Sequence, residues 1–225
     1  GGGNDDEQTA FLFVEGRCNM AAKDVHVQAR GHIDGIGLGH PAAAGPGTST
    51  NCHNSGGGCY TNRGASHGGR GGVARKPRSF TFVAHDQWPG IDDPADEQVS
   101  GGEGGYGSYL RPLTMGSGAG GERGGAGGSA LHLVAETLRV DGVITMDGQN
   151  GVTGETSHCR YGGGGGAGGS ILLEIEQISG SGTIRAVGGT GGTGHRDRSC
   201  RRHGGGGGGG RIALLCKNTD FSGAW

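Results

Sequence analysis

The residues with the most specific chemistry in this chain are its six cysteines: Cys18, Cys52, Cys59, Cys159, Cys200 and Cys216. Only 31% of the residues are hydrophobic and 5% are aromatic, which is little for a conventional core. An even number of cysteines in such a chain favours disulfides, and disulfides persist in oxidising compartments. The cysteines therefore predict an extracellular or cell-surface protein.

The positions of the cysteines suggest how they pair. Cys159 and Cys200 lie 41 residues apart, and each follows a polar segment and precedes a run of glycines. If these segments belong to adjacent repeats, their loops are neighbours and a disulfide is geometrically reasonable. Cys52 and Cys59 would close a small loop. The first and last cysteines of the chain then pair by elimination, and other connectivities stay open.

Histidines beside some of the cysteines raise the alternative of a metal site. Two candidate ligand sets are His158, Cys159, Cys200 and His203, and Cys52, His53, Cys59 and His67. Neither set has the tight Cys-x-x-Cys pairs of structural zinc sites, and arginines crowd the first set. Calcium-binding β-helices use Gly-Gly-x-Gly-x-Asp, and the segment that starts at Gly188 lacks the aspartate. We therefore expect no metal and no cofactor.

No group of residues indicates catalysis. Asp141 and Asp147 are six residues apart, and turn chemistry alone explains an aspartate before Gly142. Matches to Gly-x-Gly-x-x-Gly arise by chance in a glycine-rich chain, and none is followed by the Lys-Ser/Thr of a phosphate-binding loop. We expect no catalytic residue and no enzymatic activity.

Glycine dominates the elements that must position these residues, with 58 of 225 positions. Two runs, Gly162–Gly166 and Gly204–Gly210, lead into the apolar stretches that begin at Ile171 and Ile212. Flexible linkers are one explanation for such runs. The other is ordered packing as extended polyglycine-II helices, whose backbones bond to one another. The repeated position beside apolar stretches favours packing.

An internal repeat supports this interpretation. Gly142-Val-Ile and Gly182-Thr-Ile lie 40 residues apart, and each continues into a glycine-rich loop, a cysteine and a glycine run. Gly31-His-Ile is an earlier copy, and Gly223 starts another in which Trp225 takes the place of the isoleucine. Both ends of the sequence cut through a copy, as in a segment of a longer repeat protein.

Short apolar stretches in each copy alternate with polar residues, as half-buried strands do. The stretches that begin at Leu131, Leu138, Ile171 and Ile184 show this pattern, and none shows a helical period. The predicted fold is all-β, a repetitive β-solenoid or stacked β layers with packed polyglycine-II segments and almost no α-helix. Residues 1–47 form a first repeat, 48–128 an insert, and 129–225 tandem repeats of which the last is truncated.

The segment 129–225 resembles the glycine-rich repeats of large extracellular and cell-surface proteins, and residues 1–47 do so more loosely. The resemblance rests on the glycine runs, on Ser170-Ile-Leu-Leu and on Gly180-Ser-Gly-Thr-Ile-Arg-Ala. It implies a β-solenoid or stacked polyglycine-II and β layers at a cell surface or in a matrix. It implies no catalytic residue.

These observations predict a structural extracellular protein that forms part of a fibre, appendage or matrix by stacking of its glycine-rich repeats. Its partners would be neighbouring repeats or subunits. The alternative is an adhesin or receptor-type module that binds protein or glycan through the 48–128 insert or its loops. Ice or polysaccharide binding would need regular ladders of threonine or aromatic residues. A net charge of −2 gives no reason to expect nucleic acid, and no apolar run is long enough to span a membrane.

Overall fold

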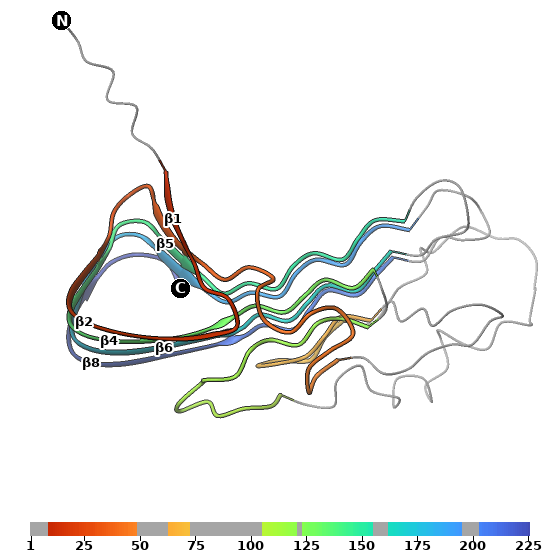
Figure 1. The fold of residues 1–225 in the computed structure, drawn as a ribbon, viewed down its shortest axis with the longest axis horizontal. Coiled ribbons are helices and arrows are strands. Elements are labelled where there is room, and N and C mark those ends of the chain that lie inside the picture. Colours follow the sequence, from red (N-terminus) through yellow and green to blue (C-terminus); the bar gives the residue numbers. More distant parts are fainter. Residues whose placement is uncertain (1–8, 49–62, 73–104, 121–122, 155–161, 195–202) are drawn as a thin grey trace, which may run out of the picture.

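The computed structural model describes residues 9–48, 63–72, 105–120, 123–154, 162–194 and 203–225 (Figure 1). These residues contain eight strands and no helix. The strands are β1 (Ala10–Phe13), β2 (Arg17–Val27), β3 (Gly31–Asp34), β4 (Ala130–Val140), β5 (Val143–Thr145), β6 (Ser170–Gly180), β7 (Thr183–Arg185) and β8 (Arg211–Phe221).

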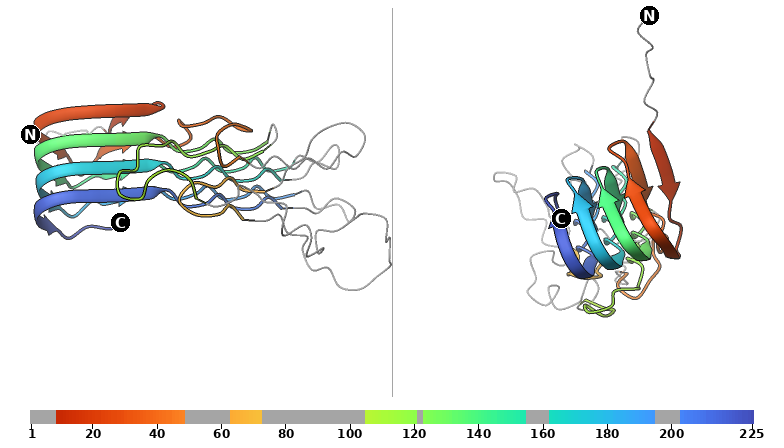
Figure 2. Two further views of the ribbon diagram at one scale, coloured as in Figure 1. Left: turned by 90° about the horizontal axis from the view of Figure 1, so that it is seen from below. Right: turned by 90° about the vertical axis from the view of Figure 1, so that its left-hand side faces the viewer.

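The strands form two sheets in which every neighbouring pair is parallel. The four long strands, each of 11 residues, form one sheet in the order β2-β4-β6-β8, which we call the long sheet. The four short strands form the short sheet in the order β1-β3-β5-β7. Figure 2 shows the long strands lying one above another. β2, β4 and β6 each pass through a tight turn into the next short strand, so the two sheets advance together.

The turns between the sheets depend on glycine. After β6 the chain reverses at Gly180, whose φ of +106° is strained for a residue with a side chain. A Cβ atom there would also lie 2.1 Å from the carbonyl oxygen of Val140 in the turn of the preceding copy. The turns of successive copies therefore pack directly on one another through their backbones.

The core lies between the two sheets and is built from rows of equivalent residues. Leu131 pairs with Ile171, and Leu133 with Leu173, and all four are fully buried. In the short sheet, a row of isoleucines faces them from the other side: Ile33, Ile144 and Ile184. Because the strands are parallel and in register, each apolar position in one copy stacks on the same position in the next.

The predicted β-solenoid is wrong. The two sheets do not close on each other, and the described residues between β5 and β6, 146–154 and 162–169, form no strand. The physical reason lies in the composition of that segment, because glycine has no side chain to pack on a pleated surface and is a poor strand former. The 40-residue spacing specifies how the copies align, but it does not specify closure.

The glycine-rich segments instead leave the sheets together and run side by side away from them (Figure 1). They are packed backbone against backbone. Gly165 donates its N–H to Gly205 O at 2.9 Å, and Gly189 donates to Gly166 O at 2.8 Å. A Cβ atom on Gly163 would lie 1.7 Å from the carbonyl oxygen of Arg123. Both glycine runs are therefore packed elements of the fold and are not linkers.

Candidate functional site: two open sheet edges

Each end of the double sheet carries strands that have no further strand partner among the described residues. We call the side formed by β1 and β2 the β2 edge, and the side formed by β8 with Ala224 and Trp225 the β8 edge. Ala224 extends the short sheet by pairing in parallel with Thr183 of β7, and its N–H donates to Gly182 O at 3.0 Å. The backbone groups on the outer sides of these edges can pair with another strand.

The core is open at both edges. On the β2 edge, Phe11, Leu12 and Phe13 are about half to two-thirds exposed, and on the β8 edge Trp225 is 55% exposed. Residues of the long sheet that face the core are also only partly buried where they belong to edge strands: Cys18, Met20 and Val25 in β2, and Ile212, Leu214, Cys216 and Phe221 in β8. Exposed apolar surface of this kind marks interaction sites on folded proteins.

The outer face of the long sheet carries a row of charges that crosses all four strands. Lys23, Glu136, Glu176 and Lys217 occupy the same register position, with the lysines on the edge strands and the glutamates in the middle. Lys217 forms an ion pair with Glu176. A shallow groove crosses the sheet along this row and along the neighbouring row of Ala21, Val134, Glu174 and Leu215. Both edge strands contribute to its lining.

A second charged group lies near the turn that follows β4. Asp141 accepts hydrogen bonds from Arg139 Nε at 2.6 Å and from His26 Nε2 at 2.9 Å. These two bonds, the arginine first, lower the pKa of the Asp141 carboxyl. His26 belongs to β2 and Arg139 to β4, so the group ties the β2 edge to the rest of the sheet. The sequence predicted a role in a turn for Asp141, but it did not predict these ion pairs.

Asp147, the other carboxylate of the sequence analysis, joins two copies of the repeat. It is buried, it accepts a hydrogen bond from the backbone N–H of Val187 at 2.8 Å, and it forms an ion pair with Arg185 at 2.8 Å. Asn150 also connects two copies of the repeat, because its Oδ1 accepts a hydrogen bond from the backbone N–H of Thr190 at 2.8 Å. These contacts explain the polar residues in the glycine loops as connections between copies.

The structure places Cys18 and Cys216 on opposite edges of the long sheet, and both are free thiols. Two strands lie between them, so three strand spacings of about 4.8 Å separate their backbones. That exceeds the ~7 Å within which a disulfide can form, and the pairing of Cys18 with Cys216 by elimination is wrong. Cys52, Cys59, Cys159 and Cys200 lie outside the described residues.

The candidate metal ligands are only partly described. Of the two proposed sets, the structure describes His67 and His203, while His53, His158 and the cysteines lie outside it. His67 is in contact with Thr114 and Gly168, and His203 accepts a hydrogen bond from Gly194 N at 3.3 Å. In the part of the chain that the structure describes, no three His, Cys, Asp or Glu residues converge on one point.

A buried polar cluster around His67 was not predicted. The His67 ring is fully buried, its Nδ1 lies 2.6 Å from Gly168 O, and its Nε2 lies 2.9 Å from the hydroxyl of Thr114. The ring packs against Tyr106, whose hydroxyl donates to Met115 O at 2.6 Å. Burial is the main cause that lowers the pKa of His67, and the positive charge of Arg211 adds to it.

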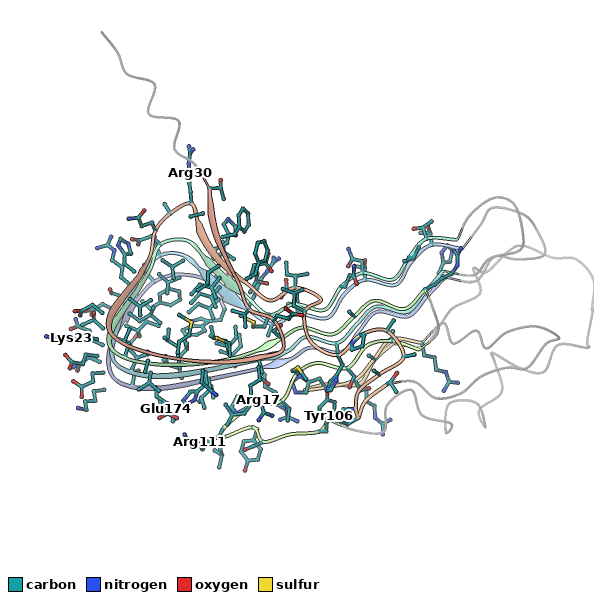
Figure 3. All side chains as sticks on the ribbon, viewed as in Figure 1. Arg17, Lys23, Arg30, Tyr106, Arg111 and Glu174 are labelled. Carbon is teal, nitrogen blue, oxygen red and sulfur yellow. The ribbon has the colours of Figure 1, made fainter. Side chains whose placement is uncertain are left out.

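This cluster fixes residues 63–72 and 105–118 onto the glycine segments and the sheet. Ser170 at the start of β6 donates its hydroxyl to Thr114 O at 2.6 Å, and Arg111 forms an ion pair with Glu174 on the outer face (Figure 3). Leu172 alternates with the core-facing residues Ile171 and Leu173 and so points outward from the sheet, yet it is fully buried. His67 and Tyr106 are each one of three residues of their type in the 48–128 insert, and no spacing in the sequence marks them for such a cluster.

Among the described residues, no helix has the length and the apolar character needed to cross a membrane. Comparison with known proteins adds no assignment, because no family model, no curated protein and no solved structure matches this chain.

Proposed function

We propose that this chain is a structural building block of an extracellular or cell-surface assembly, and that its open sheet edges join it to neighbouring units. One observation carries the proposal. Both parallel sheets end, on both sides, in described strands with no further strand partner and with the core apolar residues partly exposed. Unpaired strands with apolar side chains are templates for strand addition.

The glycine layer supports a structural role in a different way. Its segments approach so closely that a side chain would collide with backbone at most positions, so the layer has little freedom to adapt to a ligand. Rigid, periodic packing suits a unit that transmits a fixed spacing to its neighbours. The even number of cysteines in the sequence supports an oxidising, extracellular setting.

Electron microscopy of native material tests this function. We expect filaments or layers with a strand spacing of about 4.8 Å along their axis, because strands of the neighbouring unit would continue the sheets of this chain. Dispersed single chains that bind a protein or glycan saturably would contradict this structural function. They would favour the alternative of a binding module that uses the 48–128 insert.

A further inference from the structure

We propose that the β2 edge receives one parallel strand from a neighbouring unit, and that this strand carries apolar residues at alternate positions and a carboxylate beside Lys23. The inference rests on the proposed function of the edges and names what one of them binds. It follows from an offset between the two sheets, from the partly exposed residues around it, and from the charge of Lys23.

The two sheets are offset by one strand at the β2 edge. The long strands β2, β4 and β6 turn into β3, β5 and β7, so each pair forms one layer of the fold. β1 lies one layer further out, because it pairs with β3 on the side away from β5. Among the described residues, no long strand accompanies β1 in that layer. We call the place beside β2, on the side away from β4, the open strand position.

The β8 edge has no such offset. The chain turns from β8 into Ala224, and Ala224 pairs with Thr183 of β7, so this outermost layer contains both a long strand and a short segment. The two ends of the fold therefore differ in shape, and only the β2 edge offers a place for a single long strand beneath an existing short one.

The residues around the open strand position are apolar and incompletely covered. Cys18, Met20 and Val25 pack against the core from β2 but are only partly buried. Leu12 of β1 is 47% exposed, whereas Ile33, its partner in β3, is 5% exposed. Ile33 has β2 as the long strand of its layer and Leu12 has none. A strand in the open position would therefore cover Leu12 and complete the core.

The opposite edge shows which charge suits this position. Lys23 and Lys217 occupy the same register position on the two edge strands, and Lys217 forms an ion pair with Glu176 of β6. The open strand position is related to β2 as β6 is related to β8. Lys23 is exposed, extends away from the sheet (Figure 3), and forms no ion pair with another described residue. A carboxylate on the added strand would supply that partner.

The residues directly before β1 lack the required sequence pattern. In the other layers, two or three residues separate the end of the long strand from the start of the short strand. Because β1 begins at Ala10, a long strand in the same relation to it would end at residue 6 or 7. Residues 1–8 contain no hydrophobic residue and cannot provide the alternation. We therefore assign the added strand to a neighbouring unit.

A peptide with the sequence of β6, Ser170–Gly180, is a suitable probe, because β6 fills the equivalent position beside β8. In the same alignment on β2, its Leu173 would lie beside Met20 and its Glu176 beside Lys23. The fluorescence anisotropy of the labelled peptide, titrated with the full-length chain, measures binding. We expect saturable binding of one peptide per chain.

Charge exchange identifies the edge that binds. Lys23→Glu should weaken binding of the peptide about fivefold, and a peptide that carries Glu176→Lys should restore it. Lys217→Glu is the matched control, since Lys217 is exposed in the same row but on the β8 edge, and this variant should bind the original peptide like the wild-type chain. Circular dichroism confirms that each variant is folded.

Amide hydrogen exchange locates the added strand without any substitution. The bound peptide should slow exchange in Arg17–Val27 and leave Arg211–Phe221 unchanged, because new backbone hydrogen bonds form only along β2. No binding to the folded chain, a loss of affinity in Lys217→Glu but not in Lys23→Glu, or protection of β8 in place of β2 would overturn the inference.

These outcomes are separable from the proposed function. Filaments in native material together with a peptide that does not bind would overturn strand addition at β2 and leave the structural role standing. Dispersed native material would contradict the structural role, even where the peptide binds along β2.

Discussion

Gly207 lies against the backbone of Gly166, so that a Cβ atom added to Gly207 would meet the carbonyl oxygen of Gly166 at 1.9 Å. Two residues further on, a Cβ atom on Gly209 would meet nothing within 4 Å. The glycines within a single run therefore differ in what they do. Gly207 permits close contact between segments, whereas Gly209 lies at an open position.

Alanine substitutions in this run should have opposite effects. Gly207→Ala forces the segments apart, and we expect it to lower the free energy of unfolding by about 1–3 kcal/mol. Gly209→Ala restricts the unfolded chain without a clash, and we expect it to be neutral or to stabilise by up to about 1 kcal/mol. Chemical denaturation of both variants measures this. Equal losses in the two would show that the run is not packed as described.

The two aspartates of the repeats should also differ. Asp147→Ala leaves the backbone N–H of Val187 without its acceptor in a partly buried place, and we expect it to cost about 1–2 kcal/mol of stability. Asp141→Ala removes ion pairs that are exposed to solvent and should cost less. Thermal unfolding of both variants makes the comparison. A larger loss for Asp141→Ala would contradict the role of Asp147 as the connection between copies.

Acidic pH should destabilise the cluster around His67. Its pKa is lowered in the folded chain, mainly by burial, so the unfolded chain binds the proton more readily. Stability is therefore complete above the ordinary histidine pKa of about 6.5, and is lost as the pH falls from there toward the lowered pKa of the folded state.

A variant isolates this effect from the other nine histidines. His67→Gln should be less stable than the wild-type chain at pH 8, because it replaces a packed ring that bonds on both sides. The difference between the two should shrink as the pH falls below about 6.5. Free energies of unfolding across this pH range test it, and a difference that stays constant or grows on acidification would contradict the burial of a neutral ring.

Part of this fold could be predicted from the sequence. The 40-residue spacing of Gly142-Val-Ile and Gly182-Thr-Ile reflects the pairing of Val143 with Thr183 in neighbouring strands. The alternation at Leu131 and Ile171 likewise indicated strands with one buried face. Local spacing carries this information, because parallel strands in register repeat the same residue types at the same positions.

The errors concern features that local spacing does not encode. Closure into a solenoid depends on whether the glycine segments form strands, and they do not. Cys18 and Cys216 were paired because they were the two cysteines that remained. That inference took no account of the edge strand to which each belongs. Which side chains each edge strand exposes could not be predicted, since the order of strands in space is fixed by packing of the whole chain.

The association of the chain tests the central claim, that its open sheet edges join it to neighbouring units. Ala21 and Leu215 are exposed on the edge strands β2 and β8, where an added lysine opposes the addition of a further strand. Val134→Lys is the control, because Val134 is exposed in the same register row but on the central strand β4.

The measurement is sedimentation velocity of the full-length wild-type chain and of the Ala21→Lys, Leu215→Lys and Val134→Lys variants, with circular dichroism to confirm folding. We predict concentration-dependent association of the wild-type chain and of Val134→Lys, and weaker association of the two edge variants. A wild-type chain that stays monomeric, or edge variants that associate as strongly as Val134→Lys, would contradict the account.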